Sequence, residues 1–207
     1  MGDRVIDGYQ AAAGSLIAPY EALSCDEIYQ HVRDLMPVAP VRVLDIGAGT
    51  GRDAAWLAGQ GHAVTAVEPV PRFLAAARGL HADHGIVWID DRLPDLTAMR
   101  QRNERFDLLL MGGVWQHLSP SQRETAWPVL ADLMAPGATM ILSLRHGPGA
   151  PGRPVFPARD VDVLRAARDL GLRMLRRQRA GSIQAGNRAA GVDWTWFVLR
   201  APGGGTP

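Results

Sequence analysis

The sequence contains no lysine, because all 22 of its basic side chains are arginine. A Schiff base on lysine and a lysine general base are therefore excluded as mechanisms. Cys25 is the single cysteine, so neither an internal disulfide nor a cysteine metal cluster can form. His62, His81 and His84 are dispersed without the supporting ligands of a metal site, and we predict no metal. This cysteine usage is typical of a reduced compartment, and we expect a cytoplasmic protein.

Net charge and long apolar runs are also lacking. The formal net charge is +1, which gives no strong general attraction to nucleic acid or to an anionic membrane. The cluster of Arg173, Arg176, Arg177 and Arg179 is typical of a solvated face rather than of a nucleic-acid site. No apolar run reaches membrane-spanning length, and the first residues lack a signal-peptide pattern. We therefore expect neither a membrane nor a nucleic-acid partner.

From residue 41 onward, strand-like segments alternate with helix-like segments. This alternation predicts an α/β fold, a doubly wound and mainly parallel sheet with helices on both faces. The turn-rich stretch 181–191 joins the last two strand candidates and predicts an antiparallel hairpin at the sheet edge. The strands are expected at 41–46, 62–68, 85–89, 105–111, 138–144, 172–177 and 194–199. The helices are expected at 51–60, 71–82, 120–134 and 160–170.

Two further helices are expected before the first strand, at 9–18 and 26–36, the second capped by Ser24 or Asp26. A chain of 207 residues, 47% of them hydrophobic, is compatible with one domain and a sizeable core. The last residues have little to bury. The expected organisation is a single domain over 1–200, divided into a helical segment 1–40 and a core 41–200, with a disordered tail 201–207.

The run from Val43 to Asp53 has the pattern of a buried strand, a glycine turn and the start of a helix. Its glycines stand at alternate positions, where they let the backbone turn sharply and let a ligand approach the peptide groups. A dinucleotide fingerprint needs a third glycine where this chain has Arg52, so a phosphate-binding turn fits poorly. The free amides from Gly49 to Asp53 favour a ligand carboxylate, with which Arg52 is expected to pair.

Glu68 ends the next strand candidate, about one βαβ unit downstream of the glycine turn. A carboxylate at this position can accept hydrogen bonds from the hydroxyls of a ribose. A solvated acid after a strand would not explain its position relative to the turn. The two features together therefore predict a nucleoside site at the carboxyl ends of the strands.

These features resemble the class I S-adenosylmethionine-dependent methyltransferases, in particular the small single-domain members that act on small molecules. Asp45–Gly51 is similar to the first motif of that family, Glu68 to the acid that ends its second strand, and Asp90–Asp91 to its adenine-facing motif. Residues 106–118 are similar to its fourth strand and the loop lining the methyl-transfer cleft. The resemblance covers about residues 41–144 and implies a Rossmann-like, seven-stranded sheet with a C-terminal antiparallel hairpin and N-terminal lid helices.

The resemblance implies that S-adenosylmethionine is the cofactor and S-adenosylhomocysteine the product. Glu68 would hold the ribose, Asp90 or Asp91 the adenine amino group, and the backbone carbonyls of Met111 and Gly112 the ammonium group. The candidate cofactor-binding residues are Asp45, Gly47, Ala48, Gly49, Arg52, Asp53, Glu68, Pro69, Asp90, Asp91, Met111, Gly112 and Trp115.

Three candidate residues have more than one interpretation. Asp45 either contacts the ligand or braces the glycine turn from behind. Trp115 packs on the cofactor, roofs the substrate cleft or belongs to the core. His117 is the best-placed catalytic candidate. It either acts as a general base, which typically raises the rate roughly 10²- to 10⁴-fold, or buttresses the next helix.

The candidate substrate contacts come from three segments. The resemblance places the N-terminal segment as a lid over the cleft, where Tyr20 either contacts substrate or seals a helix against the sheet. Arg145 and His146 follow the fifth strand, with Arg153 nearby in the chain. They either bind an anionic acceptor or belong to a surface loop. His117 completes the candidate substrate-binding set.

We therefore expect methyl transfer to a small-molecule acceptor by in-line displacement, which requires alignment and exclusion of water more than acid–base groups. Residues 106–118 lack the Asn/Asp-Pro-Pro-aromatic pattern of amino-methylation, and Cys25 lies far from them, which disfavours a cytosine-carbon methyltransferase. Two other function classes stay open. One is a non-catalytic subunit or sensor that binds S-adenosylmethionine or S-adenosylhomocysteine, and the other is an oxidoreductase-like nucleotide domain, which Arg52 disfavours.

Overall fold

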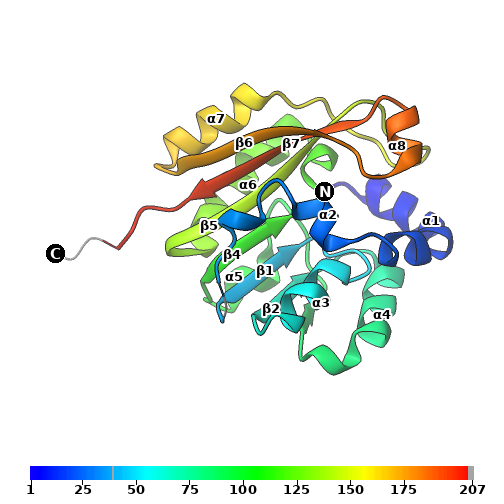
Figure 1. The fold of residues 1–207 in the computed structure, drawn as a ribbon, viewed down its shortest axis with the longest axis horizontal. Coiled ribbons are helices and arrows are strands. Elements are labelled where there is room, and N and C mark those ends of the chain that lie inside the picture. Colours follow the sequence, from blue (N-terminus) through cyan, green and yellow to red (C-terminus); the bar gives the residue numbers. More distant parts are fainter. Residues whose placement is uncertain (39, 205–207) are drawn as a thin grey trace.

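Seven strands within the described residues, 1–38 and 40–204, form one sheet in the computed structural model (Figure 1). The strands are β1 (Arg42–Ile46), β2 (Ala63–Val67), β3 (Val87–Ile89), β4 (Phe106–Met111), β5 (Met134–His146), β6 (Arg173–Gly181) and β7 (Asp193–Arg200). Their order is β3-β2-β1-β4-β5-β7-β6. β1 to β5 pair in parallel, and β7 pairs antiparallel with both β5 and β6. The predicted doubly wound, mainly parallel sheet with a C-terminal hairpin is confirmed.

Helices cover both faces of the sheet because its central strands are apolar on both sides. In β1, Leu44 and Ile46 pack with α5 (Thr97–Gln101), α6 (Pro120–Leu133) and α7 (Asp160–Asp169). Val43 points to the other face and packs with α2 (Cys25–Tyr29) and α3 (Arg52–Gly59). The remaining helices are α1 (Asp3–Glu21), α4 (Pro71–Leu80), α8 (Ala185–Ala189) and the short 3₁₀ turns η1 (Arg33–Leu35), η2 (Ala82–His84) and η3 (Trp115–His117).

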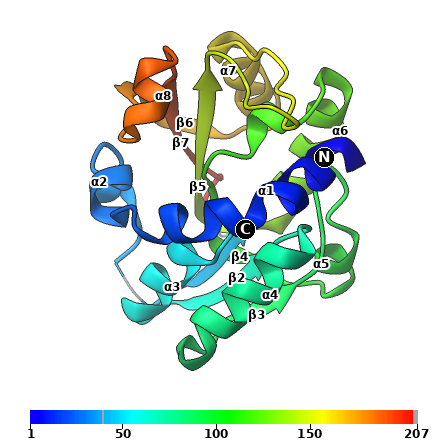
Figure 2. The same cartoon turned by 90° about the vertical axis from the view of Figure 1, so that its right-hand side faces the viewer.

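Helix α1 lies across the carboxyl-end edge of the sheet (Figure 2). The amino group of Met1 donates to the carbonyl of Leu93, and the Arg72 amide at the start of α4 donates to Gln10 Oε1 at 3.0 Å. The edge it covers includes the ends of β1 and β4, where the strand order reverses. Ligands of doubly wound sheets bind at this reversal point, so α1 lies over the expected ligand site.

The secondary structure differs from the sequence-based expectation in a few places. The helix expected at 26–36 is wrong, because α2 ends at Tyr29 and only the 3₁₀ turn η1 follows. Ser24, one of the two expected caps, accepts from the Glu27 amide at 3.3 Å. β5 begins four residues before the expected Ala138, since Pro136-Gly137 does not break it. α5 and α8 were not predicted, because helices of one turn have no periodic apolar face.

Two residues of the predicted tail are held by backbone hydrogen bonds. In the tail predicted to be disordered, the Ala201 amide donates to Ala138, and the Gly137 amide donates to Pro202, each at 2.8 Å. These two residues therefore extend the pairing with β5, whereas residues 205–207 of that prediction lie outside the described residues.

No helix in residues 1–38 and 40–204 has both the length and the apolar character needed to cross a membrane.

The packing around Gly51 yields a stability prediction. Gly51 has φ +88°, and a Cβ there would lie 2.5 Å from the ring of Trp88. We expect Gly51→Ala to lower the free energy of unfolding by about 2–5 kcal/mol. The strain of a left-handed backbone at alanine and the overpacking against Trp88 both contribute to this loss. Urea denaturation measures the loss. In the matched control Gly59→Ala, at the last residue of α3 and facing open space, stability is expected to stay the same or to rise by up to about 1 kcal/mol. Equal effects of the two variants would contradict the prediction.

Candidate active site

The glycine turn between β1 and α3 is tied to the end of β2. The Gly47 amide donates to the Val67 carbonyl at 2.8 Å. Glu68 adds a side-chain link, since its Oε2 accepts from the Gly49 amide at 2.7 Å and its Oε1 from the Val70 amide at 2.8 Å. Burial raises the pKa of this carboxyl to about 7, although the two amide hydrogen bonds act in the opposite direction. The predicted ribose-binding acid is thus a buried acceptor directly beside the turn.

A cavity of about 370 Å³ opens beside the glycine turn. Its wall includes Gly112–Gly113 at the end of β4, side chains of α1 and α2, and residues of β5 and β7. The structure therefore brings together segments that are far apart in the sequence. The predicted site residues that line the cavity are Gly47, Ala48, Gly49, Arg52, Asp53, Glu68, Gly112, Tyr20, His117 and Arg145.

The other predicted site residues do not line this cavity. Asp91 holds the start of α5, because its oxygens accept from the Arg92 amide at 2.8 Å and from the Met99 amide at 3.0 Å. Trp115 is fully buried against Trp127, with ring centroids 4.9 Å apart, so of its interpretations the structure supports the core. The residues outside the cavity wall are Asp45, Pro69, Asp90, Asp91, Met111, Trp115 and His146.

Asp45 is a buried carboxyl behind the glycine turn. Its Oδ2 finds no hydrogen-bond partner among the described residues. Burial, followed by the nearby charge of Asp53, raises the pKa of Asp45 well above its usual range. The side chain does not line the cavity, and no hydrogen bond joins it to the turn among the described residues, so the choice between bracing and ligand contact stays a prediction.

The pleat of β5 separates Arg145 from His146. Arg145 lines the cavity together with Trp194, its neighbour on β7. The His146 Nε2 atom instead lies 2.8 Å from Thr195 Oγ1 and 3.7 Å from Asp160 Oδ1. Successive side chains of a strand point to opposite faces, so two adjacent residues cannot both face one cavity. The predicted pairing of these two residues on one substrate is therefore corrected: Arg145 faces the cavity and His146 does not.

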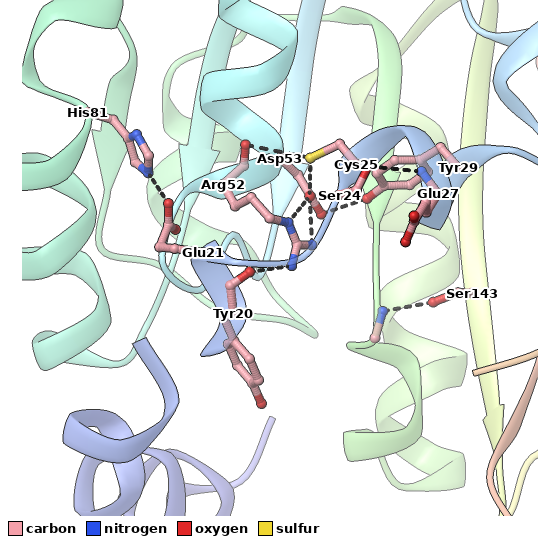
Figure 3. A network of polar contacts seen from close by, with 11 residues as sticks. Tyr20, Glu21, Ser24, Cys25, Glu27, Tyr29, Arg52, Asp53, His81 and Ser143 are labelled. Carbon is pink, nitrogen blue, oxygen red and sulfur yellow. Dashed lines mark hydrogen bonds and ion pairs between the residues drawn. The ribbon is translucent and has the colours of Figure 1, made fainter. Parts of the chain in front are cut away.

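Arg52 and Asp53 form the centre of a polar network, shown in Figure 3. Asp53 Oδ1 lies 2.7 Å from both Nε and Nη2 of Arg52, whose Nη1 donates to the Tyr20 carbonyl at 2.9 Å. Asp53 also accepts from the Tyr29 hydroxyl at 2.6 Å and from Cys25 Sγ at 3.3 Å. The network fastens α2 and the end of α1 to the first turn of α3.

This network corrects one expectation and supports another. The sequence predicts an ion pair between Arg52 and a ligand carboxylate, whereas the guanidinium is engaged by Asp53 and by the Tyr20 carbonyl. Burial raises the pKa of the Cys25 thiol to about 12. A thiol that stays protonated is a poor nucleophile, which agrees with the argument against cysteine catalysis.

His117 lies at the cavity with both ring nitrogens engaged. Its Nδ1 is 2.8 Å from the Pro154 carbonyl oxygen and therefore carries the proton, while its Nε2 lies 2.9 Å from the Tyr9 hydroxyl. This assignment follows from the network, since a carbonyl can only accept. Burial lowers the pKa of the imidazole below its usual value, which favours the neutral ring. An unprotonated Nε2 beside a cavity is the form that a general base requires.

Comparison with known proteins shows which family this part of the chain resembles. Residues 43–137 match a family model described as "Methyltransferase domain". These residues run from β1 to the start of β5 and include the glycine turn, Glu68 and Gly112. Residues 43–137 are therefore the part of the chain that is similar to a methyltransferase domain.

Curated relatives match only part of the chain. A ubiquinone biosynthesis O-methyltransferase of Bradyrhizobium diazoefficiens is 37% identical over 95 residues, which are 46% of this chain and 37% of the relative. An uncharacterized methyltransferase of Mycobacterium tuberculosis is 28% identical over 134 residues, 61% of this chain and 49% of the relative. The chain thus spans about half or less of the length of these relatives.

Solved structures extend the fold similarity to most of the chain. A 1,6-didemethyltoxoflavin-N1-methyltransferase of Burkholderia thailandensis, solved with its substrate and S-adenosylhomocysteine, has a TM-score of 0.62 at 22% identity, covering 93% of this chain and 89% of that one. A methyltransferase of Methanosarcina mazei has a TM-score of 0.67 at 13% identity, covering 83% and 97%. At these identities, the likeness establishes the shared fold.

Several residues that line the cavity were not predicted. Ser143 and Trp196 belong to no motif, yet they line the cavity together with Arg145 and Trp194. Ser143 and Arg145 are two residues apart on β5, and Trp194 and Trp196 are two residues apart on β7. Each pair therefore lies on one face of the sheet, and this spacing can be seen in the sequence. Tyr29, hydrogen-bonded to Asp53, gives no such signal because it lies on the one-turn helix α2.

The Arg52–Asp53 pair yields a stability prediction. Their side chains are 18% and 13% exposed, whereas those of the Arg33–Asp26 pair are 54% and 60% exposed. We expect Asp53→Ala to cost about 3 kcal/mol of unfolding free energy, because Arg52 is left buried without its partner. The control Asp26→Ala is expected to cost less than about 1 kcal/mol. Urea denaturation compares the two variants, and similar losses of unfolding free energy would show that the Arg52–Asp53 network does not contribute to stability.

Proposed function

We propose that this protein transfers the methyl group of S-adenosylmethionine, the methyl donor of its family, to a small-molecule acceptor. The observation that carries the proposal is the cavity in which the glycine turn, Glu68 and Gly112 converge on His117. This cavity lies at the reversal point of the sheet, within the part of the chain that is similar to a methyltransferase domain. Relatives described as O-methyltransferases and a neighbour bound to S-adenosylhomocysteine support the same chemistry.

The residues of the cavity fit the cofactor. Glu68 is buried and accepts only one hydrogen bond on each oxygen, so each oxygen keeps a lone pair for a ribose hydroxyl. A Cβ at Gly112 would lie 3.1 Å from the Tyr29 hydroxyl, so a larger residue would crowd this wall of the cavity. Asp91 is engaged with α5, which leaves the exposed Asp90 as the candidate for the adenine amino group.

The protein's own part in the reaction is to position the acceptor, exclude water and accept a proton. When bound, S-adenosylmethionine supplies a methyl group on a positively charged sulfur. Helix α1 covers the cavity, with Tyr9 and Tyr20 in its wall, and thereby limits access of water. The Tyr9 hydroxyl donates to His117 Nε2, so a proton from the acceptor's hydroxyl or ammonium group reaches Nε2 through Tyr9, which gives up its own proton and takes the acceptor's. The Pro154 carbonyl holds the ring in the required tautomer.

Titration calorimetry with S-adenosylmethionine, S-adenosylhomocysteine and NAD, followed by a methyl-release assay on a panel of phenols, amines and carboxylates, tests the proposal. We expect the first two to bind and NAD not to bind, with S-adenosylhomocysteine released when an acceptor is methylated. Binding without methyl release across the panel would favour the non-catalytic sensor. Preferential binding of NAD would overturn the proposal.

The raised pKa of Glu68 predicts a pH dependence of cofactor affinity. Ribose hydroxyls donate to the ionised carboxylate, so affinity for S-adenosylhomocysteine should rise as pH increases through about 7. The expected gain is roughly tenfold between about pH 6 and about pH 8. Glu68→Gln should bind at least roughly tenfold more weakly at the upper pH and lose this dependence. The surface control Glu104→Gln should behave like the wild type; an unaltered pH profile in Glu68→Gln would refute the ribose contact.

Removal of His117 separates catalysis from binding. We expect His117→Ala to lower kcat roughly 10²- to 10⁴-fold for a hydroxyl acceptor and to leave the affinity for S-adenosylhomocysteine unchanged. The wild-type rate should rise with pH through a value below 6.5, because burial lowers this pKa, and the variant should lack that rise. His84→Ala, at an exposed site, is the control. An unchanged kcat would assign His117 a structural role.

A further inference from the structure

Two arginines line the cavity without an acidic partner. Arg145 comes from β5, and Arg153 comes from the loop between β5 and α7. Among the described residues, no carboxylate oxygen lies within 4.0 Å of either guanidinium, whereas Arg52 in the same cavity is paired with Asp53. A cation that is partly buried and unpaired is costly to keep in a protein, so this pair needs a counter-charge.

Both guanidinium groups are held against aromatic rings. The Arg145 Cζ atom lies 5.9 Å from the ring centroid of Trp194, and the Arg153 Cζ atom lies 5.2 Å from that of Tyr9. Such stacking covers the flat face of a guanidinium and leaves the N–H groups at its edge for other partners. The aromatic rings therefore orient both side chains before any ligand binds.

The N–H groups of the two arginines are poorly satisfied. Arg145 Nη1 and Arg153 Nε are buried and have no hydrogen-bond partner among the described residues. Arg145 Nη2 reaches Asn187 Oδ1 only at 3.4 Å, and Arg153 Nη1 reaches the Tyr20 hydroxyl only at 3.5 Å. Buried donors are normally paired, so these N–H groups leave both guanidinium groups short of partners among the described residues.

The arginines stand next to the candidate base. Arg153 stacks on the same Tyr9 ring whose hydroxyl hydrogen-bonds His117 Nε2. Arg145 stacks on Trp194, and a Cβ at Gly113, two residues after the end of β4, would lie 3.6 Å from that indole. A group held by both arginines would therefore be close to His117 and to the end of β4, where the methyl acceptor is proposed to bind.

We propose that the methyl acceptor carries an anionic oxygen group, a carboxylate or a phosphate, which Arg145 and Arg153 bind together. This inference deepens the proposed function, on which its assignment to the acceptor rests. Guanidinium groups match the geometry of both anions with two parallel hydrogen bonds, and the stacked rings of Tyr9 and Trp194 supply apolar walls for the rest of the molecule. His146 takes no part, because it faces the other side of β5.

The test uses benzoate, phenyl phosphate and the neutral isostere benzamide, titrated by NMR into the full chain saturated with S-adenosylhomocysteine. We expect benzamide to bind at least roughly tenfold more weakly than the better of the two anions. The better anion identifies the group as carboxylate or phosphate. Arg145→Gln and Arg153→Gln should each weaken anion binding roughly tenfold and leave the affinity for S-adenosylhomocysteine unchanged, which also shows that the variants fold.

Controls separate this inference from the proposed function. Arg168→Gln changes an arginine whose side chain is 77% exposed, and it should bind the anions like the wild type. Arg145→Lys keeps the charge and should retain part of the anion affinity. Equal binding of benzamide and the anions, or anion binding that both glutamine variants leave intact, would overturn the inference. If S-adenosylhomocysteine itself fails to bind, the proposed function fails, and the same titrations on the free protein still decide whether the arginine pair binds anions.

Discussion

The hydrogen bonds from Gly49 and Val70 to the Glu68 carboxylate are the constraint on which the cavity depends. They join the glycine turn after β1 to the end of β2, so the two strand ends cannot separate without exposing a buried acid. The glycine turn is possible only because its residues tolerate positive φ, +73° at Gly47 and +59° at Gly49. A short acidic side chain and a flexible backbone thus form one unit that sets the shape of this end of the cavity.

The cover of the cavity is attached both by an apolar cluster, in which Ala13 of α1 packs with Val70 and Phe73, and by polar contacts. Arg52 and Asp53 connect the end of α1 and helix α2 to α3, and Tyr9 connects α1 to His117. The two ends of the resulting cavity differ in the charge of their side chains. Carboxyl groups lie near the glycine turn, whereas Arg145 and Arg153 lie beside Trp194 and Tyr9. This polarity matches the positively charged cofactor and the anionic acceptor proposed above.

Much of the fold was predictable because the central strands and the longer helices carry strong patterns. β1, β2 and β4 consist mostly of apolar residues, and α6 begins with a capping box of Ser119 and Gln122. The failures occurred where local signals are weak. α5 has no capping side chain of its own and depends on Asp91, which accepts from Met99 eight residues along the chain. The segment 26–36 has helix-compatible residues throughout, yet its helix ends at Tyr29, whose side chain is buried between Trp56 and Trp196.

The sequence by itself determined the succession of the strands and the longer helices, the strand–glycine turn–helix segment at 43–53 and the acid that follows β2, because each depends on neighbours within a few residues. Tertiary structure alone decided which side chains meet in the cavity. It placed Arg145 inside and His146 outside through the pleat of β5, engaged Arg52 with Asp53, and brought Tyr9 to His117 from 108 residues away. Those outcomes depend on which faces of distant elements pack together, and a local pattern carries no information about the partner that an element will meet.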